Sequence, residues 1–366
     1  MNDHINTKKV MLFSLSIFKR SFHMFFRNKT SLQKAYPFYA DFLCSGLGNP
    51  GNLCYLNSLL QTFASSSQWT HFFNKTAGTH PVLQELANLI NSLREPFSVR
   101  SSLSTKYVRQ LFSKINISSS ANRQQDFHEF YMKVLVSIEK LFHQSVTINL
   151  SNFSTLRIFP AHIVYKESIT CSLCHHMVCQ ISQESSIILG LQNGSLSLAL
   201  QEYFGPVTLT SQCPHCGRTN NRTLTRRMIF PPKNILFFIS RVQFAEVPST
   251  SPFSYPAYID MTQFCFAAGE MTKKDDGLLK MALGGISEAI QDGKNGYELT
   301  SVVAFHGREN SGHYLAYRVH RETSPPYAKR WVCASDNSVK PVTLEDVINA
   351  NKQAILLNYE IVRNED

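Results

Sequence analysis

Cys54 follows a stretch whose composition favours a tight turn. Three glycines, one proline and two asparagines fall within seven positions, in Gly46-Leu47-Gly48-Asn49-Pro50-Gly51-Asn52. Immediately afterwards, apolar residues recur at the i, i+3, i+4, i+7 spacing of an amphipathic helix, at Leu56, Leu59, Leu60 and Phe63. Cys54 is therefore predicted at the N-terminus of a helix, where the dipole and the free N–H groups favour the thiolate. A nucleophilic cysteine needs this setting, and a cysteine without it is more often a buried structural thiol.

Two groups of the same turn are candidates for stabilising an oxyanion. The backbone N–H of Cys54 and the side-chain amide of Asn49 can converge on the carbonyl oxygen of a tetrahedral intermediate. Removal of one such donor typically lowers a rate by about 10²–10³. We therefore expect Asn49 to take part in the reaction of Cys54.

A histidine beside a predicted hairpin is the preferred base for this cysteine. Residues 297–305 and 313–319 are typical of strands, and the polar stretch 307–312 joins them as a turn. His313 lies at the mouth of this hairpin, where its side chain can lean out of the sheet. A single histidine in such a place is more often structural, but a nucleophilic Cys54 requires a base.

A third group is expected to fix the tautomer of His313. The predicted strand 331–334 ends at Ser335, Asp336 and Asn337, three hydrogen-bonding residues in a row. One of them should accept the second imidazole N–H. Because neighbours on a strand point to opposite faces, Ser335 and Asp336 should not both face His313 unless the strand has already ended.

A second helix is predicted over residues 124–135 and beyond, with His128 in its first turn. Its apolar stripe is formed by Phe127, Phe130, Val134, Ile138 and Leu141. His128 is an alternative base. A helical histidine flanked by Asp126 and Glu129 is more simply a structural hydrogen-bonding residue, so His313 is preferred.

Two Cys-x-x-Cys pairs predict a zinc site in the middle of the chain. The pairs are Cys171/Cys174 and Cys213/Cys216, with 38 residues between them. Four thiolates close a tetrahedral Zn²⁺ site without an open position, which makes the site structural. The neighbouring His175, His176 and His215 leave the ligand set open, and unmetallated pairs are the alternative. A catalytic zinc is disfavoured because no His-Glu-x-x-His helix accompanies the pairs. Strand-like runs at 156–159 and 187–189 indicate β-structure around them.

Composition places the chain among ordinary globular proteins. Its 366 residues are 43% hydrophobic and 17% charged, and 36 basic residues against 26 acidic ones give a formal net charge of +10. The excess of basic residues is consistent with a zinc-dependent nucleic-acid binder, but no arginine-rich run or aromatic RNA-binding pattern supports that interpretation. Nine cysteines, an odd and unevenly placed set, favour metal binding and catalysis in a reducing compartment over a disulfide scaffold.

The first 43 residues differ from the rest. The apolar run 10–18 is too short to span a bilayer, which needs roughly 20 residues, and basic residues flank it. Residues 1–43 are therefore either a targeting or surface-anchoring segment or a basic extension of the domain that follows. Further elements are a buried strand at 234–239 and a helix near 278–290.

In the order of its motifs, the chain resembles the ubiquitin-specific protease family of deubiquitinases. The similarity covers nearly all of the sequence from Gly46 to Glu360. Residues 46–55 resemble the cysteine box, residues 124–130 the second motif, and the two Cys-x-x-Cys pairs the zinc-binding fingers. Residues 255–260 resemble the strand before the C-terminal half, residues 311–314 the histidine box and residues 354–360 the closing strand.

This resemblance implies an α+β fold with a papain-like cysteine protease core, a helical thumb, a β palm and zinc-tipped β fingers. The catalytic domain would occupy residues 44–364, with fingers at roughly 155–230. Cys54 would be the nucleophile, His313 the base and Asn49 the oxyanion donor. Ser335 stands where the family usually has Asp or Asn. This serine is similar to the one that the mitochondrial outer-membrane member of the family carries. Leu53 stands where threonine is usual, a change that we interpret as neutral packing.

The predicted function is that of a thiol isopeptidase that cleaves after the C-terminal glycine of ubiquitin on protein conjugates. The alternative is a weak or inactive ubiquitin-binding module. We expect a monomer whose partners are ubiquitin and ubiquitinated proteins, with no nucleic acid, a structural Zn²⁺ and association with a membrane surface through the N-terminus. The catalytic domain should face the cytosol, either at the mitochondrial outer membrane or free in the cytoplasm.

Overall fold

The computed structural model of the chain describes residues 45–49, 51–95, 110–114, 126–145, 159–241, 249–266, 295–308, 311–321 and 329–362. The chain divides into two compact units, and all of these residues belong to the second unit. The N-terminal segment 1–43, residues 156–158 of a predicted strand and the predicted helix at 278–290 lie outside the described residues. Within the described ranges, no helix combines the length and the apolar character needed to cross a membrane.

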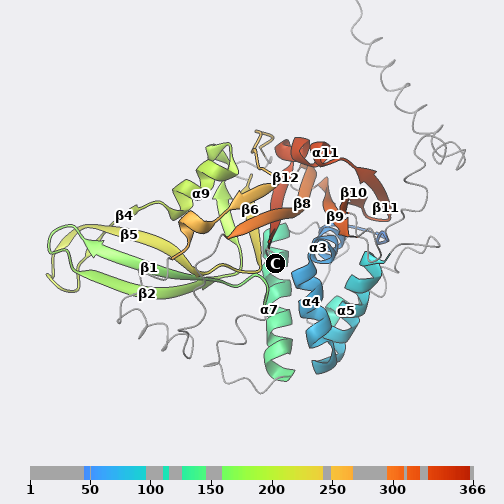
Figure 1. Cartoon of the computed structure of the whole chain (residues 1–366), viewed down its shortest axis with the longest axis horizontal. Helices are drawn as coiled ribbons and strands as arrows, with labels where there is room; N and C mark the ends of the chain where they lie inside the picture. Colours follow the sequence, from blue (N-terminus) through green and yellow to red (C-terminus); the bar gives the residue numbers. More distant parts are fainter. Residues whose placement is uncertain are drawn as a thin grey trace, which may run out of the picture. The chain divides into compact units, whose positions relative to one another are not determined.

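Helices and strands alternate in groups along the chain (Figure 1). The helices are α3 (Cys54–Ser65), α4 (Ser67–Thr76), α5 (Pro81–Arg94), α7 (Phe127–Ser145), α9 (Leu196–Phe204) and α11 (Leu344–Asn349). The strands are β1 (Ile163–Cys171), β2 (Met177–Glu184), β3 (Ile187–Gly190), β4 (Val207–Gln212), β5 (Thr219–Phe230), β6 (Asn234–Ser240), β7 (Tyr258–Asp260), β8 (Gly296–Arg308), β9 (Ser311–Arg321), β10 (Lys329–Ser335), β11 (Ser338–Val342) and β12 (Ala354–Ile361). Single 3₁₀ turns lie at Ala77–Thr79, Leu191–Asn193, Thr262–Phe264 and Ala350–Lys352.

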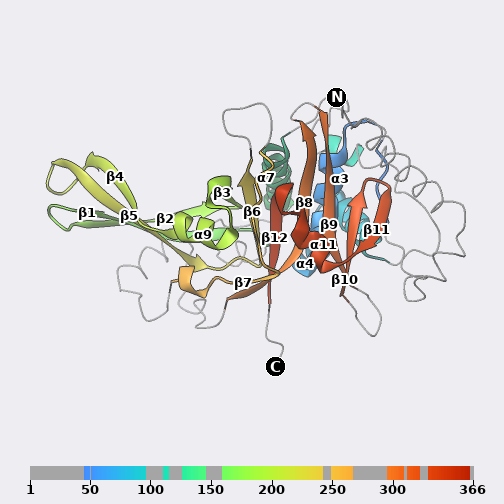
Figure 2. The ribbon, with the colours of Figure 1, turned by 90° about the horizontal axis from the view of Figure 1, so that it is seen from above.

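The strands form two sheets. The larger sheet has eight strands in the order β11-β10-β9-β8-β12-β6-β3, with β7 paired to β8 off this path. All its pairs are antiparallel except that of β3 with β6. The smaller sheet has the antiparallel order β2-β1-β5-β4 (Figures 1 and 2). Both Cys-x-x-Cys pairs lie at the strand ends and turns of this sheet. These two sheets and the helices give the mixed α+β fold that the sequence predicted.

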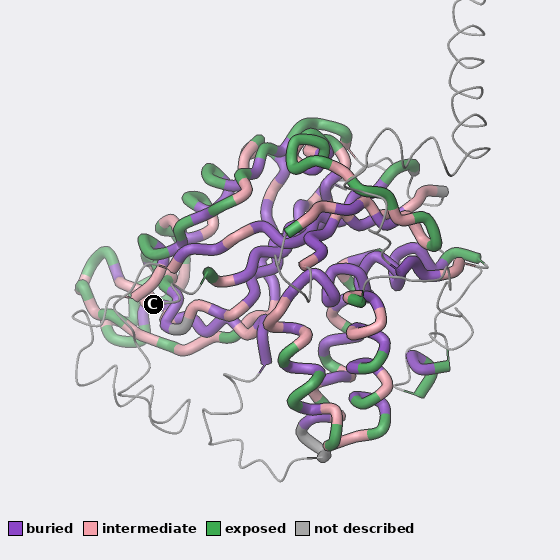
Figure 3. Tube along the Cα trace, turned by 45° about the vertical axis from the view of Figure 1, so that its right-hand side comes forward, coloured by how far each residue is buried: buried purple, intermediate pink, exposed green. Residues whose placement is uncertain are grey.

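Both faces of the larger sheet are covered, which explains the unbroken apolar run of β6. Leu236 and Phe238 pack in one core with α3, α5 and α7, whereas Ile235, Phe237 and Ile239 pack in a second core with α9. A strand that is buried on both faces cannot alternate between apolar and polar residues. Figure 3 shows buried positions along the central strands and exposed ones on outer helix faces and loops.

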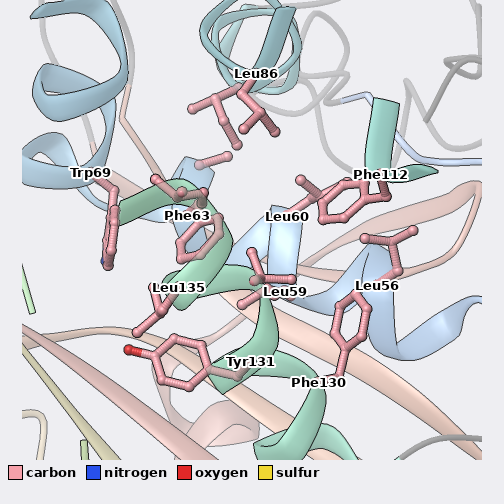
Figure 4. Packing of buried hydrophobic residues seen from close by; sticks show 14 of the residues in the cluster. Leu56, Leu59, Leu60, Phe63, Trp69, Leu86, Phe112, Phe130, Tyr131 and Leu135 are labelled. Carbon is pink, nitrogen blue, oxygen red and sulfur yellow. The ribbon is translucent and has the colours of Figure 1, made fainter. Parts of the chain in front are cut away.

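Helix α3 lies at the centre of the first core. All twelve of its residues are buried. Figure 4 shows its apolar side chains among those of α5, α7 and the neighbouring segments, with Leu56, Leu59, Leu60 and Phe63 against Leu86, Phe112, Phe130, Tyr131 and Leu135. Because α3 cannot shift without disturbing this packing, its first residue, Cys54, has a fixed position.

Two arginines, the buried Arg318 and the half-buried Arg94, also hold the helices at their C-terminal ends. Arg318, fully buried on β9, donates to the backbone oxygen of Leu93 near the end of α5 at 2.7 Å. Arg94 donates to the backbone oxygen of Ala64 near the end of α3 at 2.9 Å. Cations near helix C-termini satisfy free carbonyl groups and oppose the helix dipole. Burial and the nearby Arg318 lower the pKa of Arg94 to about 10.

The hairpin that carries His313 is longer than predicted. The sequence placed a turn at 307–312, but the ladder of β8 and β9 continues to the pair Arg308 and Ser311. His313 therefore lies inside a strand, directly opposite His306. A second difference concerns the predicted strand at 156–159, since Phe159 lies in a bend. The other predicted strands, at 187–189, 234–239 and 331–334, are present.

Candidate active site

Cys54 is the first residue of α3, as predicted. Its side chain is 4% exposed. Leu53, at the N-cap, is fully buried and provides no side-chain cap. In the turn before the helix, Oδ1 of Asn49 accepts the N–H groups of Leu53 at 3.0 Å and of Gly51 at 3.1 Å. The asparagine therefore shapes the turn that leads into the helix.

The turn before Cys54 packs against the β10–β11 hairpin. A Cβ atom on Gly46 would lie 2.7 Å from the backbone of Asn337, so only glycine permits this close approach. The N–H of Leu47 donates to the backbone oxygen of Asp336 at 2.9 Å. The two parts of the chain that hold the predicted nucleophile and the predicted third group thus contact each other directly.

His313 lies between the two residues that were considered for the third group. Its Nε2 is 2.7 Å from the Oγ of Ser335, and its Nδ1 is 4.0 Å from Oδ2 of Asp336. Strand β10 ends at Ser335, and Asp336 has a left-handed backbone with φ of 52°. Because the strand has ended, the alternation rule does not apply, and both side chains lie on the side of His313. Only Ser335 is within hydrogen-bond distance.

The thiol of Cys54 contacts the strand that carries His313. Burial raises the pKa of Cys54 above its ordinary value, and the negative charge of Asp336 raises it further. The backbone N–H groups of Tyr314, Tyr55 and Cys54 itself oppose this effect but do not reverse it. The sequence predicted that the start of the helix favours the thiolate; the backbone N–H groups do lower the pKa of Cys54, but burial outweighs them. The thiol must lose its proton during the reaction.

The amide of Asn49 is close to the site but already has one partner. Its Nδ2 donates to Oδ2 of Asp336 at 3.0 Å. An amide nitrogen carries two N–H groups, so the second remains for an oxyanion. The other oxygen of Asp336, Oδ1, accepts from Nδ2 of Asn57 at 2.7 Å. The sequence analysis did not identify Asn57, although this polar residue interrupts the apolar pattern one turn after Cys54.

His128 has a structural environment. Its Nε2 lies 3.3 Å from the Oγ of Ser186, and its ring packs edge-on against Phe238 with centroids 4.4 Å apart. Burial lowers the pKa of His128 below its ordinary value, although Asp126 opposes this. Hydrogen bonding to Ser186 and packing against Phe238 account for the residue without a catalytic role.

The four cysteines of the two Cys-x-x-Cys pairs lie together at the end of the smaller sheet. Their sulfur atoms are all within 4.8 Å of one another, with Cys171 and Cys216 at 4.0 Å and Cys174 and Cys213 at 3.7 Å. A tetrahedral site with Zn–S bonds of about 2.3 Å requires sulfur atoms about 3.8 Å apart, so the arrangement fits Zn²⁺. Backbone N–H groups lower the pKa of Cys171 and of Cys213, the first cysteine of each pair, which favours ligating thiolates there, whereas burial and the neighbouring cysteines raise the pKa of Cys174.

The three histidines beside these cysteines are not part of the cluster. Among the described residues, the metal-compatible group contains the four cysteines alone. His176 and His215 stack on each other instead, with ring centroids 4.6 Å apart and planes at 10°. His175 follows the first pair in a left-handed conformation. The ligand set that the sequence left open is therefore best described as four cysteines.

A buried cysteine at a helix N-terminus, beside a strand histidine that is hydrogen-bonded to a serine, defines a papain-like thiol hydrolase. The family model described as ubiquitin carboxyl-terminal hydrolase matches residues 45–359. The chain belongs to this family of cysteine-type deubiquitinating hydrolases. The resemblance found in the sequence motifs is thus confirmed at the level of the family.

The individual relatives are distant. The chain is 24% identical to ubiquitin carboxyl-terminal hydrolase 8 of Saccharomyces cerevisiae, an alignment that covers 87% of this chain and 70% of that protein. It is 23% identical to ubiquitin carboxyl-terminal hydrolase 51 of Mus musculus, covering 87% of this chain and 52% of that protein. The chain thus spans about half of the mouse relative's length.

Solved structures show the same fold. The SAGA Ubp8/Sgf11/Sus1/Sgf73 DUB module bound to ubiquitin aldehyde contains a chain similar to this one, with a TM-score of 0.69 and 20% identity. The superposition covers 88% of this chain and 70% of that chain. A yeast SAGA DUB module with an Sgf73 variant gives a TM-score of 0.66 at 19% identity.

Proposed function

We propose that this chain hydrolyses the isopeptide bond after the C-terminal glycine of ubiquitin, with Cys54 as nucleophile and His313 as base. One observation carries the assignment of these roles: the turn before Cys54 contacts the hairpin that holds Ser335, and Ser335 lies 2.7 Å from His313. Membership of the family supports ubiquitin conjugates as the substrates. An inactive ubiquitin-binding module would not require this convergence.

The reaction begins with a proton transfer, because burial raises the pKa of the Cys54 thiol. His313 takes the proton of Cys54 on Nδ1, while Nε2–H donates to the Oγ of Ser335 and fixes the tautomer. The sulfur then bonds to the glycine carbonyl carbon, and the oxyanion accepts hydrogen bonds from the Cys54 N–H and the amide of Asn49. The C–N bond breaks, and the lysine amine leaves with the proton from His313.

Water completes the cycle. His313 accepts a proton from a water molecule, whose oxygen attacks the thioester carbonyl. The S–C bond breaks, the ubiquitin carboxylate is released, and the proton returns to Cys54. Ser335 is a neutral group, so it orients the imidazole but supplies no charge to the imidazolium. Asp336, 4.0 Å from Nδ1, is the carboxylate that supplies charge nearby.

The decisive experiment compares Cys54→Ser with the wild type. The serine variant should lose cleavage of a ubiquitin C-terminal reporter and keep its affinity for ubiquitin, because an alkoxide forms far less readily than a thiolate. Cys179→Ser, on β2 in the smaller sheet, is a matched control that should cleave normally. Measurable turnover by the Cys54 variant would refute the assignment. A salt-dependent affinity for DNA or RNA, without ubiquitin binding, would support the zinc nucleic-acid binder instead.

We propose in addition that the four cysteines hold a structural Zn²⁺. The sulfur spacing and the backbone N–H groups directed at Cys171 and Cys213 support this assignment. The metal would fix the end of β1 relative to β5 and leave no open coordination position for chemistry. We further propose that the protein acts on its substrates as a monomer.

The basic N-terminal segment motivates a proposal about location. Residues 1–43 contain the apolar run 10–18 with flanking lysines and arginines, a composition typical of surface anchors. We propose that they hold the enzyme on a membrane surface facing the cytosol, most simply the mitochondrial outer membrane, whose family member shares a serine like Ser335. A reporter fused to residues 1–43 should mark that surface, and diffuse cytoplasmic signal would refute this.

A further inference from the structure

Asn57 connects three parts of the active site although it contacts neither Cys54 nor His313 through any hydrogen bond in the described part of the chain. It lies in the first turn of α3 and is 3% exposed. Its Nδ2 donates to Oδ1 of Asp336 at 2.7 Å. The same nitrogen lies 3.4 Å from the oxygen of Leu47 and 3.3 Å from that of Gly48.

Asp336 links Asn57 to Asn49. Its two carboxylate oxygens are shared between two amides, with Oδ1 accepting from Asn57 and Oδ2 accepting from Asn49 at 3.0 Å. Both bonds involve a charged acceptor and are therefore stronger and more directional than bonds between neutral groups. The 4.0 Å separation of Asp336 from His313 is longer than a hydrogen bond. The carboxylate is thus oriented by the amides.

Asn49 is held at both ends as a result. Its Oδ1 accepts the N–H groups of Gly51 and Leu53, and one N–H of its Nδ2 is directed at Asp336. With three of its groups fixed, the second N–H of Nδ2 has one direction left. A donor that is aimed before the substrate arrives requires no reorganisation when the oxyanion forms.

We propose that Asn57 is a positioning residue for the oxyanion donor, acting through Asp336 on the amide of Asn49. The inference rests on the proposed roles of Cys54 and Asn49. Asn57 would touch no reacting atom. Its effect on the reaction would come from the place and direction of one N–H group, and displacements of about 1 Å can change rates by 10².

The test exchanges the amide and the carboxylate. Asn57→Asp places a second carboxylate against Asp336, and Asp336→Asn removes the charge without changing size. The double variant Asn57→Asp/Asp336→Asn restores one carboxylate and one amide with their positions swapped, so the repulsion between two carboxylates is removed and the side chain at position 336 still offers Asn49 an acceptor. Asn358→Asp is the matched control: Asn358 is a fully buried amide on β12 that donates to Thr300.

Two ubiquitin probes separate an oxyanion effect from an effect on the nucleophile. Ubiquitin aldehyde forms a hemithioacetal whose oxygen needs the donor, whereas a C-terminal propargyl amide reacts with the thiolate without forming an oxyanion. We expect Asn57→Asp and Asp336→Asn to lower kcat on a ubiquitin reporter by about 10²–10³ and to weaken aldehyde inhibition in parallel. KM and the rate of propargyl labelling should change less than about tenfold. The double variant should recover at least about tenfold of the lost kcat, and Asn358→Asp should keep the wild-type ratio of the two probes.

Three results would overturn the proposal. The first is a parallel fall of hydrolysis and propargyl labelling in the single variants, since that would place the effect on Cys54 or on folding. The second is a double variant that is as slow as Asn57→Asp. The third is an Asp336→Asn variant with full activity. Cys54→Ala distinguishes these outcomes from failure of the proposed function, because hydrolysis by that variant would refute the nucleophile itself whatever Asn57 does.

Discussion

The Nε2 atom of His313 lies 2.7 Å from the Oγ of Ser335, across neighbouring strands of one sheet. We expect Ser335→Ala to lower kcat by about 10- to 100-fold, because a hydrogen bond to a charged group contributes about 1.5–3 kcal/mol and the imidazolium loses one. Ser335→Asp should be tolerated or raise kcat, since a carboxylate both orients and stabilises the imidazolium. Steady-state kinetics on a ubiquitin C-terminal reporter measures both changes.

Ser338→Ala is the matched control for this prediction. Ser338 pairs with Ser335 across the β10–β11 hairpin but is exposed. Its loss should leave kcat unchanged. If Ser335→Ala were silent while Asp336→Ala abolished both turnover and propargyl labelling, Asp336 would be the residue that orients His313.

The neutral thiol of Cys54 predicts a particular pH dependence of alkylation. Burial and Asp336 raise the pKa of this thiol, so the thiolate fraction at neutral pH is smaller than for a free cysteine. The rate of iodoacetamide modification at Cys54, followed by mass spectrometry without substrate, should therefore still be rising above about pH 8.5, which is the ordinary pKa of a cysteine thiol. Asp336→Asn should move the midpoint to lower pH. A rate that is constant from pH 6 upward would instead indicate a resting thiolate–imidazolium pair.

Removal of the metal should affect stability before chemistry. Cys174→Ser or Cys216→Ser leaves three thiolates, and we expect a lower midpoint of thermal unfolding and a lower yield of folded protein. The kcat of the folded fraction should stay close to that of the wild type. Cys179→Ser is the control, since Cys179 lies in the same sheet outside the cluster. Metal analysis giving less than about half an equivalent of zinc, without chelators, would contradict a four-cysteine site.

The parts of the fold that depend on local pattern were predictable from the sequence. Cys54 at a helix start follows from the turn composition and the apolar spacing behind it, and β6 follows from its apolar run. The four-cysteine cluster follows from ligand spacing. Each of these signals lies within a few residues of the feature that it predicts, apart from the pairing of the two Cys-x-x-Cys motifs.

The contacts that complete the site have no local signal. Asn57 and Asp336 are 279 residues apart, and nothing near either residue indicates the other. The net direction of the pKa of Cys54 could not be predicted for a related reason, because the helix N-terminus is visible in the sequence and the depth of burial is not. The position of Asp336 beside His313 depended on where β10 ends, a boundary that sequence patterns locate poorly.

The two Cys-x-x-Cys turns differ in the residue that follows the second cysteine, and this difference predicts a stabilising substitution. Each turn is followed by a residue with a left-handed backbone, His175 with φ of 55° and Gly217 with φ of 70°. In each turn the N–H of that residue donates to the oxygen of the first cysteine, at 3.1 Å and 2.9 Å. Only glycine adopts this conformation without strain, and His175 is exposed, so its side chain contributes little packing.

We therefore expect His175→Gly to raise the free energy of unfolding by about 0.5–1 kcal/mol and Gly217→Ala to lower it by about 1 kcal/mol. A Cβ on Gly217 would have no heavy atom within 4 Å, so its effect reports the backbone conformation alone. Urea unfolding of the zinc-loaded protein measures both values, and reporter turnover should not change in either variant. A destabilising His175→Gly would mean that the histidine side chain contributes more to the turn than its left-handed backbone costs.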